Sequence, residues 1–155
     1  MQDNVAHIVG TEAMLAGEPG PTVGIDRDAN PHVRNDIGAF NEQWVESLRP
    51  VPPNDVLSRF RELTGARLVA LEHMTDDEWN AESFTPAGKD TYGRFMQIRV
   101  FDCWLHEQDI RDAVGMPGHQ TGLAVEVTLD EMATAMGFVV GKRAGAIDGQ
   151  SVTFE

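Results

Sequence analysis

Two residues in the segment RVFDCWLHEQDIR (99–111) have the spacing of paired metal ligands. Asp102 and His106 are four residues apart, so in a helix their side chains lie on one face, a single turn apart. A carboxylate and an imidazole in this arrangement can bind one divalent ion, as paired side chains on bundle helices do. The same residues can also form a hydrogen-bonded pair at a protein surface, and the spacing alone leaves both interpretations open.

A metal site needs at least a third ligand, and His7 is the best candidate for it. His7 lies among apolar residues in NVAHIVG (4–10), within another expected helix. Two imidazole nitrogens and one carboxylate oxygen suit zinc, while iron, nickel and manganese stay open as alternatives. Three protein ligands leave a fourth position free, which is typical of a catalytic rather than a structural zinc site.

Two neighbours of this pair bear on the prediction. Asp109 lies three residues after His106, so it would either accept a hydrogen bond from a metal-bound imidazole or pair with an arginine at the surface. Cys103 is the single cysteine of the chain, which excludes an intramolecular disulfide and a zinc site built from cysteines.

The elements that would position these residues are helices. Apolar side chains recur at helical spacing between capping residues and Pro/Gly breaks, which predicts helices over 1–16, 35–48, 55–74, 75–79, 91–114 and 127–141. Residues 80–90 are expected to form a loop, and the tail GQSVTFE (149–155) alternates like a short strand. We therefore predict an all-α, mostly antiparallel helical bundle with a strand-like C-terminal tail, forming one domain over residues 1–155.

The net negative charge of the chain excludes some classes of binding partner. Its 155 residues contain 25 acidic and 12 basic side chains, for a formal net charge of −13. This balance argues against nucleic acid or an anionic membrane as the main partner, because both are bound by clustered basic residues. No apolar run approaches the roughly 20 residues of a membrane helix, and the N-terminus has no signal-peptide pattern. We expect a soluble, cytoplasmic protein.

Two segments resemble the mycothiol-dependent maleylpyruvate isomerase family, a branch of the DinB-like metal-binding four-helix bundles. The segment RVFDCWLHEQDIRDAVGMPG (99–118) is similar to the family's second ligand segment, and VAHIVGTE (5–12) resembles its first. The resemblance covers nearly the whole chain and implies His7, Asp102 and His106 as the metal ligands. It also implies that the family's first helix and its C-terminal α/β domain are absent here, so that the chain is truncated at both ends.

The resemblance further implies a zinc enzyme that takes mycothiol, the low-molecular-weight thiol of actinobacteria, as co-substrate. A bound cation lowers the pKa of a thiol, and the thiolate would attack a small electrophile in an isomerase or transferase reaction. In such an enzyme Arg99 and Arg111 are candidates for binding a substrate carboxylate.

Two other functions stay open, together with the question of oligomeric state. One is a non-catalytic, truncated metal-binding bundle that acts as a binding or dimerisation module. The other is a hydrolase that uses zinc-bound water. A missing helix would leave apolar surface uncovered, which monomers rarely tolerate. Either a second copy covers that surface in a homodimer, or the sequence is a fragment of a longer one.

Overall fold

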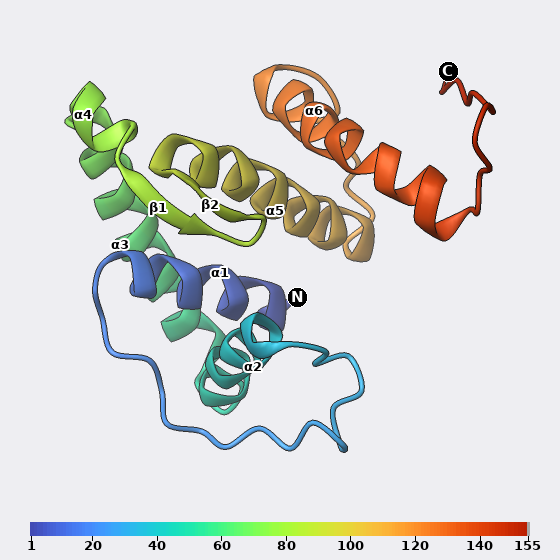
Figure 1. Cartoon of the computed structure of the whole chain (residues 1–155). Helices are drawn as coiled ribbons and strands as arrows, with labels where there is room; N and C mark the ends of the chain where they lie inside the picture. Colours follow the sequence, from blue (N-terminus) through green and yellow to red (C-terminus); the bar gives the residue numbers. More distant parts are fainter. Residues whose placement is uncertain (155) are drawn as a thin grey trace.

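The computed structural model describes residues 1–154, which form a mostly helical chain with one small hairpin (Figure 1). The helices are α1 (Gln2–Leu15), α2 (Asp36–Leu48), α3 (Pro53–Glu72), α4 (Asp76–Trp79), α5 (Tyr92–Ala113) and α6 (Leu123–Phe138), and a π-helical turn, η1 (Val139–Arg143), follows α6. The predicted all-α fold is confirmed, and each predicted helix is found with its ends shifted by a few residues. Within residues 1–154 every helix is too short or too polar to cross a lipid bilayer.

Side-chain caps fix where several helices begin. The Asn35 side chain accepts a hydrogen bond from the backbone N–H of Gly38 at 2.8 Å, at the start of α2. Thr91 does the same for the N–H of Arg94 at 3.1 Å, at the start of α5. Such caps satisfy backbone donors that have no partner inside the helix. The Thr91 cap therefore fixes the first turn of the helix that carries both Asp102 and His106.

The segment expected to be a loop contains a two-stranded antiparallel hairpin instead. Strand β1 (Glu82–Thr85) pairs with β2 (Gly88–Thr91), and Thr85 is opposite Gly88. The Thr85 side chain is fully buried and donates a hydrogen bond to the Gly88 carbonyl at 2.8 Å. Gly88 has a φ of +117°, a conformation that favours glycine. The strand sequences ESFT and GKDT do not alternate apolar and polar residues, so they lack the pattern by which a strand is predicted.

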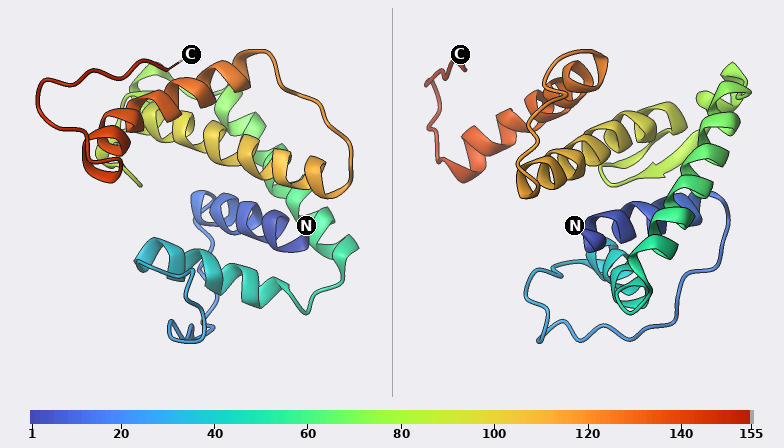
Figure 2. Two further views of the ribbon diagram at one scale, coloured as in Figure 1. Left: turned by 90° about the vertical axis from the view of Figure 1, so that its right-hand side faces the viewer. Right: turned by 180° about the vertical axis from the view of Figure 1, so that it is seen from behind.

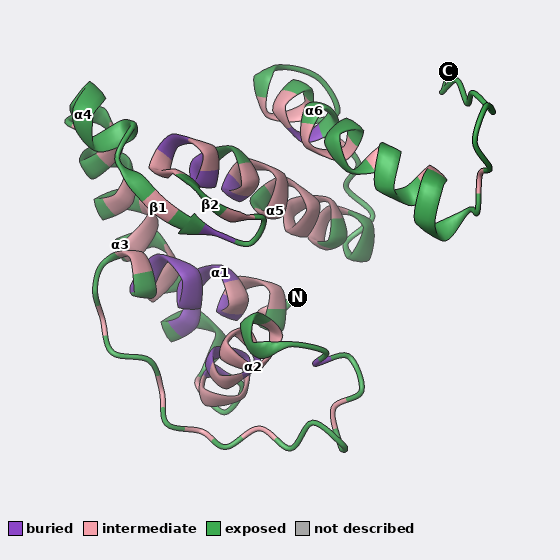
Figure 3. Ribbon diagram, in the orientation of Figure 1, coloured by how far each residue is buried: buried purple, intermediate pink, exposed green. Residues whose placement is uncertain are grey.

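The apolar core lies between α1, α2 and α3, where the buried residues are concentrated (Figure 3). Its members are Ala6, Val9, Ala13, Trp44, Val45, Leu48 and Val56, each at most 8% exposed. Small residues on α1 let the indole of Trp44 approach the helix backbone closely. The core therefore holds α1 rigidly on the side opposite to α5, which leaves the remaining face of α1 for polar contacts.

Helix α5 lies between α1 on one side and α6 on the other, and it runs in the opposite direction to α1 (Figures 1 and 2). The contact with α6 includes an ion pair of 2.6 Å between Arg94 and Glu131. On α6, Leu129 is 56% exposed. Within residues 1–154 no element covers that side of α6, so the apolar side chain remains at the surface.

The strand-like tail is the other correction to the predicted fold. Residues 151–154 have no strand assignment, and Glu155, the last residue of that segment, lies outside the described residues. A strand needs a neighbour with which to exchange backbone hydrogen bonds. The only sheet among residues 1–154 is the hairpin of β1 and β2, so the alternating sequence has no partner there.

Substituting Gly10 tests the packing of α1 against α2. A Cβ at this position would lie 2.5 Å from Cγ of Trp44, inside the distance at which atoms repel. We expect Gly10→Ala to lower the free energy of unfolding by about 2 kcal/mol, as overpacked core substitutions do. Gly65→Ala on α3 is the matched control, because nothing lies within 4 Å of its added Cβ. Urea unfolding should show Gly65→Ala as neutral or slightly stabilising, and equal stability of the two variants would contradict this packing.

Candidate metal centre

The first two candidate ligands come from one face of α5. Asp102 and His106 lie one turn apart, as their spacing predicts, and Nε2 of His106 is 3.5 Å from Oδ1 of Asp102. Both side chains are a little under one-third exposed. They therefore lie at the edge of the interface with α1, where each side chain still contacts solvent.

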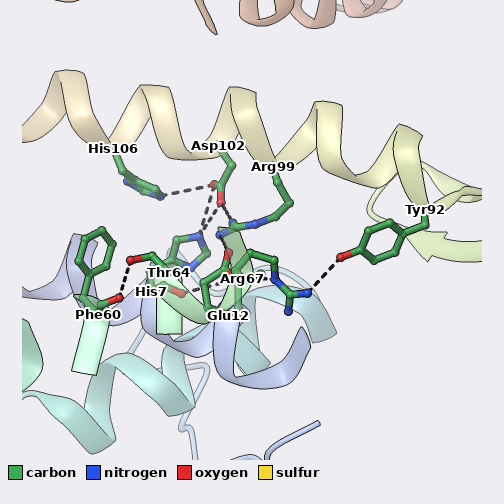
Figure 4. Close-up of polar contacts among 10 residues, drawn as sticks. His7, Glu12, Phe60, Thr64, Arg67, Tyr92, Arg99, Asp102 and His106 are labelled. Atoms are coloured by element: carbon green, nitrogen blue, oxygen red, sulfur yellow. Dashed lines mark hydrogen bonds and ion pairs between the residues drawn. The ribbon is translucent and has the colours of Figure 1, made fainter. Parts of the chain in front are cut away.

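His7 on α1 completes the cluster across the helix interface. Its Nε2 lies 3.3 Å from Oδ1 and 3.2 Å from Oδ2 of Asp102, although 95 residues separate the two in the chain. The imidazoles of His7 and His106 meet edge to face, with their centroids 4.8 Å apart. The antiparallel arrangement of α1 and α5 thus brings together the three residues that the sequence selected (Figure 4).

The separations of the donor atoms suit a small divalent ion. One ligand atom from each of His7, Asp102 and His106 lies within 4.8 Å of the other two. Ligand atoms at about 2.1 Å from a tetrahedral ion are about 3.4 Å from one another. The 3.3 Å and 3.5 Å distances from Oδ1 of Asp102 to the two imidazole nitrogens are close to this value. The donor set, two nitrogens and one oxygen, fits zinc with one position left for another ligand.

Asp102 is held from behind by an arginine. An Nη1 hydrogen of Arg99 is donated to Oδ2 of Asp102, and Nη2 of the same guanidinium donates to Oε1 of Glu12 at 2.9 Å (Figure 4). The side chains of Arg99 and Glu12 are each 8% exposed. With Oδ2 bound to Arg99, Oδ1 is the oxygen available to an ion, so the arginine sets the orientation of this candidate ligand.

The same buried network continues to α3 and to the start of α5. Oε2 of Glu12 accepts a hydrogen bond from Nε of Arg67 at 3.0 Å, and Nη1 of Arg67 donates to the hydroxyl of Tyr92 at 3.2 Å. Sequence reasoning missed Glu12 and Arg67. The available signal was Glu12 itself, a carboxylate in the predicted apolar helix at 1–16. A buried charge requires a partner, so a basic residue elsewhere in the chain could have been expected to pair with it.

The cluster changes the acidity of its members in the metal-free protein. Burial would raise the pKa of Asp102, but hydrogen bonds from His106 and His7 and the charge of Arg99 outweigh it, so this pKa is well below its usual range. The hydrogen bond to Asp102 raises the pKa of His106 above its usual value, against the opposing effect of burial. Asp102 is therefore an anion across the physiological pH range and attracts a cation.

Asp109 lies close to His106, as its predicted role of accepting a hydrogen bond from that imidazole requires. Its Oδ2 is 3.4 Å from Nδ1 of His106, the ring nitrogen that does not face Asp102. That nitrogen is buried and makes no hydrogen bond with residues 1–154, so the contact is close without being well aligned. The Asn4 amide also approaches Oδ2 of Asp109, at 3.5 Å. Asp109 is thus the carboxylate placed to accept a hydrogen bond from Nδ1 of His106 when that nitrogen carries a proton.

The two arginines considered for substrate binding lie elsewhere. Arg99 is buried, and both of its Nη groups donate to Glu12 and Asp102. Arg111 donates to Glu107 at 2.7 Å and to the carbonyl of Met116, near the C-terminal end of α5. Neither lines the cavity beside the cluster. The structure therefore gives both arginines protein partners instead of an opening toward a substrate.

A cavity of about 620 Å³ opens directly onto the cluster. The three candidate ligands form one wall of it. The other walls come from the start of α1, from α2 and from the loop between them, and consist of Asp3, Asn4, Asn30, His32, Gly38, Asn41, Glu42, Val45 and Arg49. This volume is in the range that holds small-molecule ligands, so a ligand could reach an ion at the cluster from this side.

One comparison with known proteins gives a match. The family model described as mycothiol maleylpyruvate isomerase N-terminal domain matches residues 1–111, which include His7, Asp102 and His106. No curated protein and no solved structure shows a significant match to the chain. The match covers more than two-thirds of the sequence and carries the interpretation that follows.

Proposed function

The chain belongs to the mycothiol maleylpyruvate isomerase N-terminal domain family, and from this premise we propose that it is a zinc-dependent enzyme that uses a small thiol. The ion is held by His7, Asp102 and His106, and mycothiol is the co-substrate. The reaction is an S-transfer or an isomerisation in which the thiol adds to a small electrophile. The observation that carries the proposal is the convergence of the three donor atoms within 4.8 Å at the edge of an open cavity.

The residues of the chain have separate tasks in this proposal. When bound, the cation supplies a thiolate near neutral pH by lowering the pKa of a coordinated thiol. Arg99 keeps Oδ1 of Asp102 turned toward the two imidazoles, because it occupies Oδ2. Asp109 accepts the Nδ1 hydrogen of His106, which fixes the tautomer that leaves Nε2 free to bind the ion. The cavity admits the thiol and the electrophile to the same side of the cluster.

In this proposal, residues 1–155 form one bundle domain. The protein is located in the cytoplasm of an actinobacterium, where mycothiol is available. The ion pair between Arg94 and Glu131 supports the inclusion of α6, which follows the residues that the family model matches. The electrophile is a small molecule such as an unsaturated acid, an epoxide or a xenobiotic.

Metal content and turnover test the proposal directly. Purified protein loaded with zinc and dialysed should retain about one ion per chain, measured by atomic absorption. Incubation with mycothiol and either a bimane or chlorodinitrobenzene should then give a conjugate, while omission of the thiol should abolish it. Zinc retention without conjugation would contradict the proposed thiol-using enzymatic activity. Activity without thiol would indicate a hydrolase that uses zinc-bound water.

A second candidate function, a dimerising metal-binding module without turnover, is favoured by the surface of α6. Leu123, Leu129 and Phe138 are 79%, 56% and 59% exposed, so apolar side chains of this helix are available to a second copy of the chain. Sedimentation equilibrium would show a dimer, and replacing Leu129 with serine should weaken it. A monomer at micromolar concentration would remove this alternative.

Acid should release the metal. Imidazole binds zinc only without its proton, so protons compete with the ion as the pH approaches the reference histidine pKa of about 6.5. We expect zinc content to fall from about one ion per chain at pH 7.5 to near zero below about pH 5, with recovery on return to neutral pH. Dialysis over this range followed by atomic absorption measures the loss. Full retention at pH 4 would argue against histidine ligation.

A further inference from the structure

Arg99 uses two of its three side-chain nitrogens, and the third is buried without a partner. Nη1 donates to Oδ2 of Asp102, and Nη2 donates to Oε1 of Glu12 at 2.9 Å. Nε is buried and makes no hydrogen bond with the part of the chain that the structure describes. A buried donor without an acceptor costs free energy. The arrangement around Arg99 is therefore not the one that would satisfy this side chain best.

A better arrangement for Arg99 alone would be a two-bond pair with Glu12. A guanidinium binds a carboxylate most strongly through two parallel N–H···O bonds, and Nε and Nη2 form one such edge. Oε1 of Glu12 already accepts from Nη2, so the pair lacks only a bond from Nε to Oε2. The guanidinium is planar and rigid. A turn that brought Nε to Glu12 would therefore move Nη1 away from its position on Asp102.

Arg67 on α3 occupies the oxygen that this pair would need. Its Nε donates to Oε2 of Glu12 at 3.0 Å (Figure 4). The side chains of Arg67 and Glu12 are 16% and 8% exposed, so the bond is largely shielded from water. A second bond, from Nη1 of Arg67 to the hydroxyl of Tyr92 at 3.2 Å, holds the other end of the guanidinium at the start of α5. Arg67 is thus fixed at both ends while it holds Oε2.

We propose that Arg67 is a positioning residue for Asp102. By holding Oε2 of Glu12, it limits Glu12 to one hydrogen bond with Arg99, and Nη1 of Arg99 then stays on Oδ2 of Asp102. Oδ1 of Asp102 in turn remains directed toward the two imidazoles. The hydrogen bonds of Arg67 go to Glu12 and Tyr92 and not to a candidate ligand, so it acts through two other side chains. The inference rests on the proposed function, because the oriented carboxylate is a ligand of the proposed metal site.

The first test uses the metal-free full chain. In nuclear magnetic resonance spectra of the arginine side chains, the Nε–H signal of Arg99 is assigned by its loss in Arg99→Met. In Arg67→Met this signal should move downfield, because Nε gains the released oxygen of Glu12 as an acceptor. Arg61→Met, at an exposed position of α3, is the matched control and should leave the signal in place. An unmoved signal in a folded Arg67→Met variant would overturn the inference.

The second test uses Co²⁺ alone as the probe, because its visible absorption depends on the arrangement of its ligands. Arg67→Met should shift the absorption band and raise the dissociation constant about tenfold, the lower end of the effect of residues that hold a metal ligand in place. Arg67→Lys keeps one charged donor for Oε2 and should recover most of the affinity. Tyr92→Phe removes only the hydroxyl that holds Arg67, and it should give a smaller change in the same direction should Arg67→Met fold poorly.

A stability control separates positioning from general destabilisation. Val56 lies on the same helix as Arg67 and is 2% exposed in the apolar core, apart from the buried network. Val56→Ala should lower the melting temperature through the cavity that it leaves. Its cobalt band and its cobalt affinity should match those of the wild type.

The outcomes separate the inference from the proposed function. If the wild type binds neither cobalt nor zinc while the Arg99 signal moves as expected, the proposed function is rejected and the positioning of Asp102 by Arg67 stands. If the wild type binds cobalt and Arg67→Met shows the same band and affinity, the inference is overturned and the metal site is intact. Equal changes in Arg67→Met and Val56→Ala would assign the effect to lost stability and would also overturn the inference.

Discussion

Replacing His106 with alanine is expected to lower zinc affinity by about a hundredfold or more. The proposed site has three protein ligands from two helices, and structural zinc sites gain at least about 10 kcal/mol from their full ligand set. The loss of one ligand should therefore cost about 3 kcal/mol, which is about a hundredfold in the dissociation constant. Competition with a chromophoric chelator measures the change, and thiol conjugation should fall with it.

A second histidine variant shows whether the effect is specific to the cluster. His73 follows the last turn of α3, where its Nδ1 lies 2.8 Å from the Val69 carbonyl at the surface. His73→Ala should bind zinc like the wild type. If both variants bind zinc equally well, the three-residue site is wrong, provided that circular dichroism shows both to be folded.

The second large effect is expected from Arg99→Met. This change removes the guanidinium from between Glu12 and Asp102. The carboxylate of Glu12, a residue that is 7% exposed, then has one cationic partner fewer. Breaking a buried ion pair from one side costs about 3 kcal/mol, because the remaining charge is not compensated. For a chain of this size the melting temperature should fall by roughly 6–12 °C.

The control for this variant is Arg61→Met, at an exposed position of α3. It removes the same charge and adds the same side chain, and its melting temperature should stay within about 1–2 °C of the wild type. Arg99→Met should also bind zinc more weakly, since Asp102 is then free to rotate. A variant that loses neither stability nor zinc affinity would show that the network does not position Asp102.

The proximity of His7, Asp102 and His106 could be predicted because each segment leaves a local signal. The spacing of four residues places Asp102 and His106 on one face of a helix, and the apolar neighbours of His7 indicate that His7 lies on a packed helix. The resemblance to a family then paired the two segments. Helix positions followed from the same periodicity and from caps such as Thr91.

The network behind the ligands could not be predicted in the same way. Glu12 and Arg67 are 55 residues apart and Glu12 and Arg99 are 87 apart, so no local pattern relates them. The partner of a buried charge depends on helix packing, which periodicity does not specify. For the same reason Arg99 was considered as a candidate for binding a substrate, although its position three residues before Asp102 also allowed a contact within the helix.

The division of the cluster between α1 and α5 also fixes the order of events during synthesis. His7 leaves the ribosome 95 residues before Asp102, so a growing chain exposes one imidazole long before the other two donors exist. Only when α5 has emerged and aligned with α1 can all three act on a single ion. At the proposed site, metal loading would therefore follow translation of most of the polypeptide, because His7 alone would hold an ion too weakly to retain it.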